Sequence, residues 1–340
     1  MTLEQKIKTK IKEYGPISFS EFMQFALYDE TEGFYAHGGA GRKKDFITSP
    51  EVGPLFGKLI SKAIDKCWVE FGQPSHFTFL ECGAGPGTLA KSILRSQMKC
   101  KSALKYIAVE TSSQQNQSHP PEAQTLSTMP KEIEIGIIFA NELLDNLPFD
   151  IFESQNDGSW MEVKITVDDE NISETLITNN ESAPPYTLET PKVRVPVQRE
   201  AQKWLKDASE SLHNGRIIAI DYAVESFRSQ QKQHWLRTYQ QHERNTQPLK
   251  NIGQSDITTD VDISQLAEVL PPTSIQTQAE WLQDLGIEHQ VEMSKQIWKK
   301  HAHKPDLTAL EARSAIGESE ALSDLSGLGS FKVLEWLVKS

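Results

Sequence analysis

Cysteines and long apolar runs are scarce in this sequence, and basic residues are outnumbered by acidic ones. The chain has three cysteines, Cys67, Cys82 and Cys100, and no Cys-x-x-Cys pair. An odd number at these spacings supports neither a disulfide framework nor a zinc site, so we expect a reducing compartment and no bound metal. No stretch approaches the roughly 18 apolar residues of a membrane-spanning helix, which argues against membrane insertion.

The start of the chain lacks the apolar core of a signal peptide, and Glu4 and Glu13 are unlike an acid-poor transit peptide. We therefore expect a cytoplasmic location of the bacterial type. The chain has 35 Lys and Arg against 47 Asp and Glu, for a net charge of −12. Binding to nucleic acid or anionic lipid through charge alone needs a basic face, so we expect neither partner. The 340 residues suffice for one large domain or two ordinary ones.

Residues 1–75 show helical spacing of their apolar positions. In the clearest segment, Pro50 to Gly72, apolar residues recur every three or four positions and predict one long helix with a buried stripe. The segment from Gly33 to Glu51 contains four glycines and no periodicity, which is typical of a lid or binding loop. We expect residues 1–75 to form an N-terminal helical region with a glycine-rich lid loop.

From Phe77 onward, short apolar runs at 77–82, 106–110, 136–140 and 216–222 alternate with helical segments. This alternation predicts an α/β fold with a mostly parallel sheet covered by helices. Period-two alternation at 159–179 predicts an inserted antiparallel hairpin. We expect a loop or linker at 181–196, helix and surface loop within 225–259, and two strands, or a strand and a helix, near the C-terminal end. The core is then residues 76–340, with insertions at about 151–200 and 225–275.

A glycine-rich turn follows the first apolar run. It contains Gly83, Gly85 and Gly87, with Glu81 two positions before it and Thr88 at the expected start of a helix. Glycines let the backbone turn sharply and approach a ligand, and a helix N-terminus offers free amide donors. A dinucleotide-binding turn would need glycine at position 88, and a P-loop would need Lys-Ser or Lys-Thr after the last glycine. The chain has neither.

The register of an acid two positions before three alternating glycines resembles the first motif of class I S-adenosylmethionine-dependent methyltransferases. The methionyl amine of that cofactor is cationic, and Glu81 could neutralise it directly or through water. Glu110 ends the next apolar run, 23 residues after Gly87 and close to the roughly 20-residue offset of a ribose-binding acid in doubly wound folds. The structural alternative is a set of tight turns capped by surface acids.

Asn141, Glu142 and Asp145 follow the third apolar run. Ligands in such sheets bind beyond the carboxyl ends of the strands, so Asn141 and Glu142 should face the transferring methyl group. The same residues fit a helix N-terminus, with Asn141 as the cap and the two acids in the first turn. The sequence leaves both interpretations open.

With these residues assembled, the chain resembles the MidA-like methyltransferases, a family related to the mitochondrial arginine methyltransferase that assists respiratory complex I assembly. The resemblance extends from about residue 13 to 336. It is carried by Asp45 to Glu51, Glu81 to Thr88, Val109 with Glu110, Asn141 to Pro148, Ile220 to Tyr222, Asp256 to Asp262 and Phe331 to Leu334. It implies a Rossmann-like class I core with a mostly parallel seven-stranded sheet, helices on both faces, an N-terminal helical region and inserted hairpin and helical segments.

The resemblance also implies S-adenosyl-L-methionine as the cofactor and protein arginine N-methylation as the activity. The partner is then a protein substrate, such as a respiratory complex I-type subunit, and a homodimer is one open oligomeric state. The implied cofactor-binding residues are Glu81, Gly83, Gly85, Gly87, Thr88, Glu110 and Asn141. The implied catalytic residues are Glu142, Asn141 and Asp145, and the substrate or lid residues are Asp45, Phe46, Thr48, Ser49, Glu51 and Asp221.

Three positions depart from the usual family pattern. Lys44, Pro86 and Ala223 stand where glycine, arginine and glycine are usual, which bears on the substrate pocket more than on cofactor binding. The residues leave two other functions open: a non-catalytic cofactor-binding assembly factor, and a methyltransferase for another protein or a small molecule. An NAD-dependent dehydrogenase is disfavoured by Thr88.

Overall fold

The structure, a computed structural model, describes residues 1–37, 48–179, 181–229, 234–240 and 243–339. The chain divides into two compact units, each drawn from three segments. Unit 1 comprises Met1–Gly39, Leu144–Lys206 and Ala223–Pro271, and unit 2 comprises Ala40–Leu143, Asp207–Tyr222 and Pro272–Ser340. None of the helices within the described ranges is long and apolar enough to cross a membrane.

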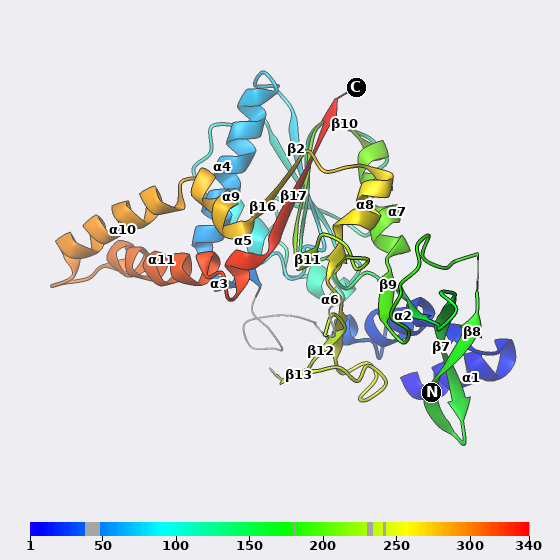
Figure 1. The fold of residues 1–340 in the computed structure, drawn as a ribbon. Helices are drawn as coiled ribbons and strands as arrows, with labels where there is room; N and C mark the ends of the chain where they lie inside the picture. The colour runs from blue at the N-terminus through cyan, green and yellow to red at the C-terminus, as the bar shows by residue number, and fades with distance from the viewer. Residues whose placement is uncertain (38–47, 180, 230–233, 241–242, 340) are drawn as a thin grey trace. The chain divides into compact units, whose positions relative to one another are not determined.

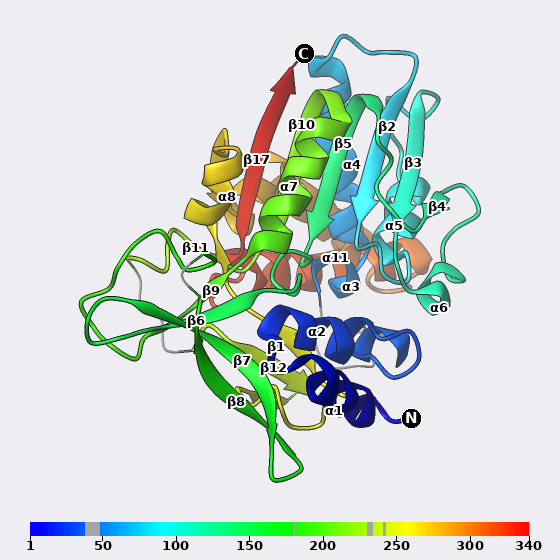
Figure 2. The same cartoon turned by 90° about the vertical axis from the view of Figure 1, so that its right-hand side faces the viewer.

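Unit 2 is built on a seven-stranded sheet in the order β16-β17-β10-β5-β2-β3-β4. Figure 2 shows the strands from β17 to β4 in this order. Its strands are β2 (Phe77–Cys82), β3 (Leu104–Val109), β4 (Gln124–Leu126), β5 (Ile133–Asn141), β10 (Leu212–Asp221), β16 (Ser274–Thr277) and β17 (Lys332–Lys339). Strands β10, β5, β2, β3 and β4 pair in parallel, and β17 is antiparallel to both neighbours. The predicted mostly parallel α/β sheet is confirmed, and the carboxyl ends of β2, β3, β5 and β10 lie at the same end of it.

Alternate residues of the central strands pack against helices. Phe79, Phe139 and Ile218 belong to a buried cluster with α4 (Pro54–Glu70), α5 (Thr88–Arg95) and α9 (Gln278–Asp284). The intervening Leu80 and Ile138 are buried as well. Both faces of these strands are therefore covered, which explains why the sequence shows short continuous apolar runs.

The long helix predicted at 50–72 is interrupted at Gly53. α3 (Ser49–Val52) ends there, and α4 begins at Pro54. A residue before proline is disfavoured in the helical region, and Gly53 is extended, with φ 164° and ψ −175°. The carboxylate of Glu318, on α11 (Leu307–Ser323), occupies the space beside Gly53 and accepts a hydrogen bond from the Leu55 amide at 2.8 Å. The spacing of apolar residues in the sequence continues across Gly53, so it does not predict the break between α3 and α4.

The segment before β17 is helical. α10 (Ile287–His301) packs against α11, as Figure 1 shows, and η2 (Leu328–Ser330) leads into β17. The sequence predicts either two strands or a strand and a helix near the C-terminal end, and the second alternative is correct.

Unit 1 has its own sheet and its own core. Capping boxes at Thr2 and Ser18 start α1 (Leu3–Tyr14) and α2 (Phe19–Tyr28), with β1 (Ile17–Ser18) between them and η1 (Phe34–His37) after them. The sheet runs β1-β7-β6-β9 and contains β6 (Asp150–Ser154), β7 (Trp160–Asp168), β8 (Asn171–Thr178) and β9 (Arg194–Val197). β8 pairs with β7 as the predicted antiparallel hairpin. Helix and sheet residues share a buried cluster that includes Phe19, Phe22 and Phe152.

Two expectations for the inserted segments are wrong in part. The predicted loop at 181–196 ends in β9, where the end position in the sheet tolerates Pro196. The described part of 225–259 contains no helix. Instead, β12 (Arg237–Gln240) pairs with β13 (Glu243–Asn245) and β14 (Asp256–Thr258). The remaining elements are α6 (Ser113–Asn116), α7 (Arg199–Ser211), β11 (Ala223–Val224), β15 (Val261–Asp262) and α8 (Ile263–Val269).

Candidate functional site

The glycine turn connects β2 to α5 at the carboxyl end of β2. Gly83, Gly85 and Gly87 have left-handed backbone conformations, with φ of 67°, 53° and 72°, which other residues adopt only at a cost. The Ala84 amide donates to the carbonyl of Val109 at 3.1 Å, and this bond anchors the turn to the end of β3. α5 begins directly after the turn, at Thr88.

Glu81 lies inside β2 with 5% of its surface exposed. The Tyr106 hydroxyl, on β3, donates to its Oε2 at 2.5 Å. Burial raises the pKa of Glu81 to about 8; the Tyr106 hydrogen bond lowers it and the charge of Glu110 raises it further. A buried carboxyl with a raised pKa is a candidate partner for a cationic ligand, because a nearby positive charge would favour its ionised form.

Glu110 follows the last residue of β3 and is almost fully buried. Its Oε2 accepts a hydrogen bond from the Gly85 amide at 2.9 Å, and its Oε1 accepts one from the Ser112 amide at 2.8 Å. These two bonds fix the carboxylate against the glycine turn. Among the described residues no other donor is bonded to it, so about two of its four acceptor positions remain there.

Glu142 follows β5 in a left-handed conformation, with φ of 52°. Non-glycine residues in this region carry strain and cluster at functional sites. Its Oε1 accepts hydrogen bonds from Nδ2 of Asn141 at 3.0 Å and from the Ser49 amide at 3.2 Å. The residues after Glu142 form a turn rather than a helix, so the helix N-cap interpretation is wrong.

Asn141, the last residue of β5, has an acceptor atom, Oδ1, beside Glu142. Its Oδ1 is buried, and no residue in the described part of the chain donates a hydrogen bond to it. Because buried polar atoms are nearly always paired, this oxygen is suited to a ligand.

Helix α3 and strand β10 also contact this segment, α3 at Glu142 and β10 at Leu143. α3 begins at the fully buried Ser49, whose hydroxyl donates to Oε1 of Gln278 at 2.9 Å; Thr48 is its N-cap and Glu51 lies in its first turn. Asp221 ends β10, and its carboxylate accepts hydrogen bonds from the Leu143 amide at 3.2 Å and the Tyr222 amide at 2.9 Å. Of the predicted site residues, Ser49 therefore contacts Glu142 directly, and Asp221 contacts the adjacent Leu143.

Asp145 belongs to unit 1, three residues along the chain from Glu142. It is buried, and its charge contributes to raising the pKa of the Tyr35 phenol, mainly an effect of burial, well above the usual range. In the same unit, the Tyr35 hydroxyl donates to Asp256 at 3.1 Å, and Arg237 donates to Asp260 at 2.5 Å. Asp145 is therefore part of a buried network of acids in unit 1 that the sequence reasoning did not identify.

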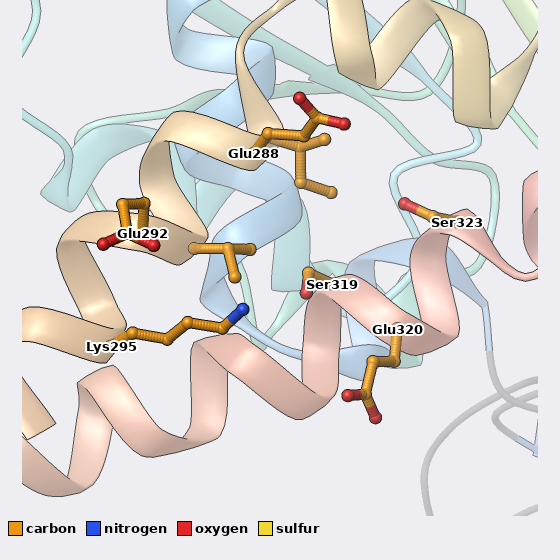
Figure 3. A pocket seen from close by; sticks show the side chains of 8 residues that line it. Glu288, Glu292, Lys295, Ser319, Glu320 and Ser323 are labelled. Atoms are coloured by element: carbon orange, nitrogen blue, oxygen red, sulfur yellow. The ribbon is translucent and has the colours of Figure 1, made fainter.

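Asp45 and Phe46 lie outside the described residues. A separate cavity of unit 2 lies between α10 and α11 (Figure 3) and contains none of the predicted site residues. Its lining residues are Ile287, Glu288, Val291, Glu292, Lys295, Ser319, Glu320 and Ser323.

Sequence reasoning also missed Tyr106 and Gln278. Tyr106 lies in an apolar run and has the pattern of an ordinary core residue, and only the pairing of β2 with β3 brings it to Glu81. Gln278 contacts Ser49 across 229 positions of sequence. No local pattern connects residues so far apart.

Comparisons with known proteins give a consistent result. A family model described as "Putative S-adenosyl-L-methionine-dependent methyltransferase" matches residues 59–280. The mitochondrial protein arginine methyltransferase NDUFAF7 homolog of Drosophila melanogaster is 26% identical over 310 residues, which cover 79% of this chain and 70% of that protein. The mitochondrial protein arginine methyltransferase NDUFAF7 of Rattus norvegicus is 27% identical over 297 residues, covering 76% and 67% respectively.

Solved structures agree with the fold. A Burkholderia thailandensis protein, crystallised with bound S-adenosyl-homocysteine, matches with a TM-score of 0.81 at 23% identity. The match covers 98% of this chain and 91% of that one.

Proposed function

The chain belongs to this S-adenosyl-L-methionine-dependent methyltransferase family, and from that premise we propose that it methylates arginine side chains of a protein substrate. S-adenosyl-L-methionine is its cofactor, and when bound it supplies an electrophilic methyl group on a sulfonium. The names of the curated relatives, which are protein arginine methyltransferases, support the choice of substrate.

The residues at the carboxyl end of the sheet fit this cofactor. Glu81 is a buried acid that a cationic methionyl amine would allow to ionise. Glu110 keeps acceptor positions for ribose hydroxyls, and the buried Oδ1 of Asn141 needs a donor. Gly83, Gly85 and Gly87 permit close approach of the backbone, and Thr88 starts the adjoining helix.

The observation that carries the proposal is the conformation of Glu142. A carboxylate is held beyond the end of β5 on a strained left-handed backbone, by hydrogen bonds from Asn141 and Ser49 to one of its oxygens. Strain of about 1–3 kcal/mol persists only where the surrounding structure enforces it, which is characteristic of functional positions.

A fixed carboxylate is what a guanidinium substrate requires. Arginine stays protonated at neutral pH, so its nucleophilic nitrogen must be oriented and its positive charge balanced during transfer. Glu142 would hold the guanidinium by charge-assisted hydrogen bonds, and Asn141 and Ser49 would keep Glu142 in place. Because in-line displacement depends on alignment of nucleophile and methyl, this positioning supplies much of the rate enhancement.

The other predicted site residues take supporting roles in this proposal. Asp221 orients the chain after Glu142 through the Leu143 amide. Asp145 is a second proposed catalytic residue behind Glu142. Thr48, Ser49 and Glu51 are proposed substrate residues, and the predicted lid role of Asp45 and Phe46 falls outside the described residues. The partner would be a subunit of a respiratory complex I-type assembly, and a cytoplasmic location and a homodimer are further predictions.

The test is a Glu142→Gln substitution. Glutamine keeps the shape and one acceptor oxygen but removes the charge, so methyl transfer should fall by about 100-fold or more. The affinity for S-adenosylhomocysteine should stay within about twofold, because the lost charge faces the substrate in this proposal. Incorporation of labelled methyl into lysate protein measures the first quantity, and titration calorimetry measures the second.

A matched control is Glu132→Gln, the same change at an exposed position just before the other end of β5. It should leave both quantities unchanged. Mass spectrometry of the labelled protein should find the methyl group on arginine. Label recovered on lysine, on a small molecule, or at the wild-type rate with Glu142→Gln would overturn the proposal.

A further inference from the structure

The geometry points to His119 as a positioning residue that holds the glycine turn in its cofactor-binding conformation. His119 lies on the connection between β3 and β4, shortly after α6, and belongs to none of the segments considered above. The inference rests on the proposed role of Gly83, Gly85 and Gly87 in binding the cofactor.

His119 bonds to the turn through one ring nitrogen and to the sheet through the other. Its Nε2 lies 2.8 Å from the carbonyl oxygen of Gly85, and its Nδ1 lies 2.8 Å from the hydroxyl of Thr125 on β4. Because a carbonyl oxygen can only accept, Nε2 carries a proton and donates to Gly85. In the neutral ring Nδ1 is then an acceptor for the Thr125 hydroxyl, so β4 orients the imidazole that holds the turn.

Both polar groups of Gly85 are thereby tied to the same connection. Its amide donates to Glu110, and its carbonyl accepts from His119. Gly85 has φ of 53° and no side chain, so its own conformational preference does not hold it in this conformation. The two bonds therefore fix the orientation of the peptide groups on either side of Gly85.

Gly87 gives independent support, because the turn is shaped around this histidine. A Cβ atom added to Gly87 would lie 2.9 Å from Cδ2 of His119 and 3.3 Å from its Cα. Glycine at this position therefore leaves space for the imidazole, and it also permits the left-handed backbone conformation. His119 and the last glycine of the turn fit together in a way that a surface histidine would not require.

Two substitutions separate the two ring nitrogens. In His119→Gln the amide nitrogen can replace Nε2 and donate to Gly85, whereas in His119→Asn the shorter side chain can replace only Nδ1 and reach Thr125. We expect His119→Asn to weaken binding of S-adenosylhomocysteine about tenfold, as for loss of one partly buried hydrogen bond, and His119→Gln to restore affinity to within about threefold. Titration calorimetry gives the dissociation constants.

A purely structural role would be seen in stability instead. The thermal midpoints of the two ligand-free variants should agree within about 2 °C, so that the difference in affinity does not follow a difference in folding. Equal affinity of His119→Asn and His119→Gln, or a loss of affinity that simply follows the loss of stability, would refute the inference.

A Gly85→Ala variant distinguishes this failure from a failure of the proposed cofactor site. Alanine is strained at φ of 53°, and its Cβ would lie 3.2 Å from Oε1 of Gln115. If Gly85→Ala binds S-adenosylhomocysteine like the wild type, the turn is not the cofactor site and both proposals about it fail. If Gly85→Ala loses affinity while the two His119 variants bind equally, only the inference about His119 fails.

Discussion

Glu81 shows how one residue can be poor for stability and useful for binding. Its carboxyl is buried and forms no ion pair with any residue that the structure describes, and burial raises its pKa from the ordinary 4.5 to about 8. Below pH 4.5 the folded and unfolded states are both protonated. As the pH rises from 4.5 toward 8, the unfolded chain loses this proton and the folded chain retains it, so the stability that the group contributes at low pH is progressively lost.

A Glu81→Gln substitution should therefore stabilise the ligand-free protein while it weakens cofactor binding. Glutamine needs no proton to remain neutral and can still accept the Tyr106 hydrogen bond, so we expect the melting temperature at pH 8 to rise by about 2–4 °C. The affinity for S-adenosylmethionine should fall about 10- to 100-fold, because a charge-assisted contact is lost. Calorimetric scanning and titration measure the two effects.

The pH dependence supplies a second readout for the same residue. In the wild type, a cationic ligand must displace the proton of Glu81, so affinity should increase from pH 6 toward pH 8 and proton release should accompany binding. Both effects should be absent in Glu81→Gln. A wild-type affinity that does not change over this range would show that Glu81 does not meet the cation.

At the level of the elements, two glycines in the middle of the unit 2 sheet leave no room for a Cβ atom beside the neighbouring strands. Gly136 on β5 is paired with Thr78 on β2 and with Gly215 on β10. A Cβ atom at Gly136 would lie 2.0 Å from the Thr78 carbonyl oxygen, and one at Gly215 would lie 1.9 Å from the Gly136 carbonyl oxygen. Glycine inside a strand often marks a site where another backbone leaves no space for a side chain, and at Gly215 it also permits the φ of 147°.

Gly136→Ala should accordingly destabilise unit 2 by about 3 kcal/mol or more, because backbone atoms rather than flexible side chains must move. The matched control is Gly317→Ala in α11, at an exposed position where an added Cβ meets nothing within 4 Å. That change should stabilise the protein by about 0.5–1 kcal/mol through helix propensity. Denaturant unfolding measures both, and similar effects of the two changes would contradict the close-approach argument.

Sequence patterns predicted the elements that repeat a strong period and missed those that depend on distant partners. β2, β3, β5 and β10 stand out because both faces are buried, and the turn at Gly83 to Gly87 follows from its glycines. The break at Gly53 depends on Glu318, which is 265 positions away, as well as on Pro54. The three strands at 237–258 lie in a polar stretch whose conformation is selected by tertiary pairing rather than by propensity.

The same limit applies to the candidate site. The sequence indicated Glu142, yet its left-handed backbone and its bond to Ser49 exist only because β5, α3 and the end of β10 meet. The resemblance groups Asp145 with Glu142 through the segment from Asn141 to Pro148. No local pattern predicts that, within unit 1, Asp145 belongs to an acidic network with Tyr35 and Asp256.

For the whole molecule, the division into two units carries a functional consequence. All the proposed cofactor residues, from Glu81 to Asn141, belong to unit 2, whereas the β6–β7–β8–β9 sheet belongs to unit 1. Each unit has a separate buried cluster, and neither cluster shares residues with the other. The sequence predicts a boundary near residue 75, between an N-terminal helical region and the core. This differs from the division into units 1 and 2 and stays a prediction.

Binding of S-adenosylhomocysteine should therefore protect one unit selectively. A ligand at 100 times its dissociation constant stabilises its binding unit by about 2.7 kcal/mol. In hydrogen-exchange mass spectrometry we expect slower exchange in peptides from 80–90, 105–119 and 138–143. The β7–β8 hairpin, Trp160–Thr178, should exchange at its ligand-free rate because its hydrogen bonds and core contacts lie within unit 1.

Glu81→Gln at the same ligand concentration is the control and should show weaker protection of the same peptides. Protection of the hairpin equal to that of the glycine turn would mean that unit 1 takes part in holding the cofactor.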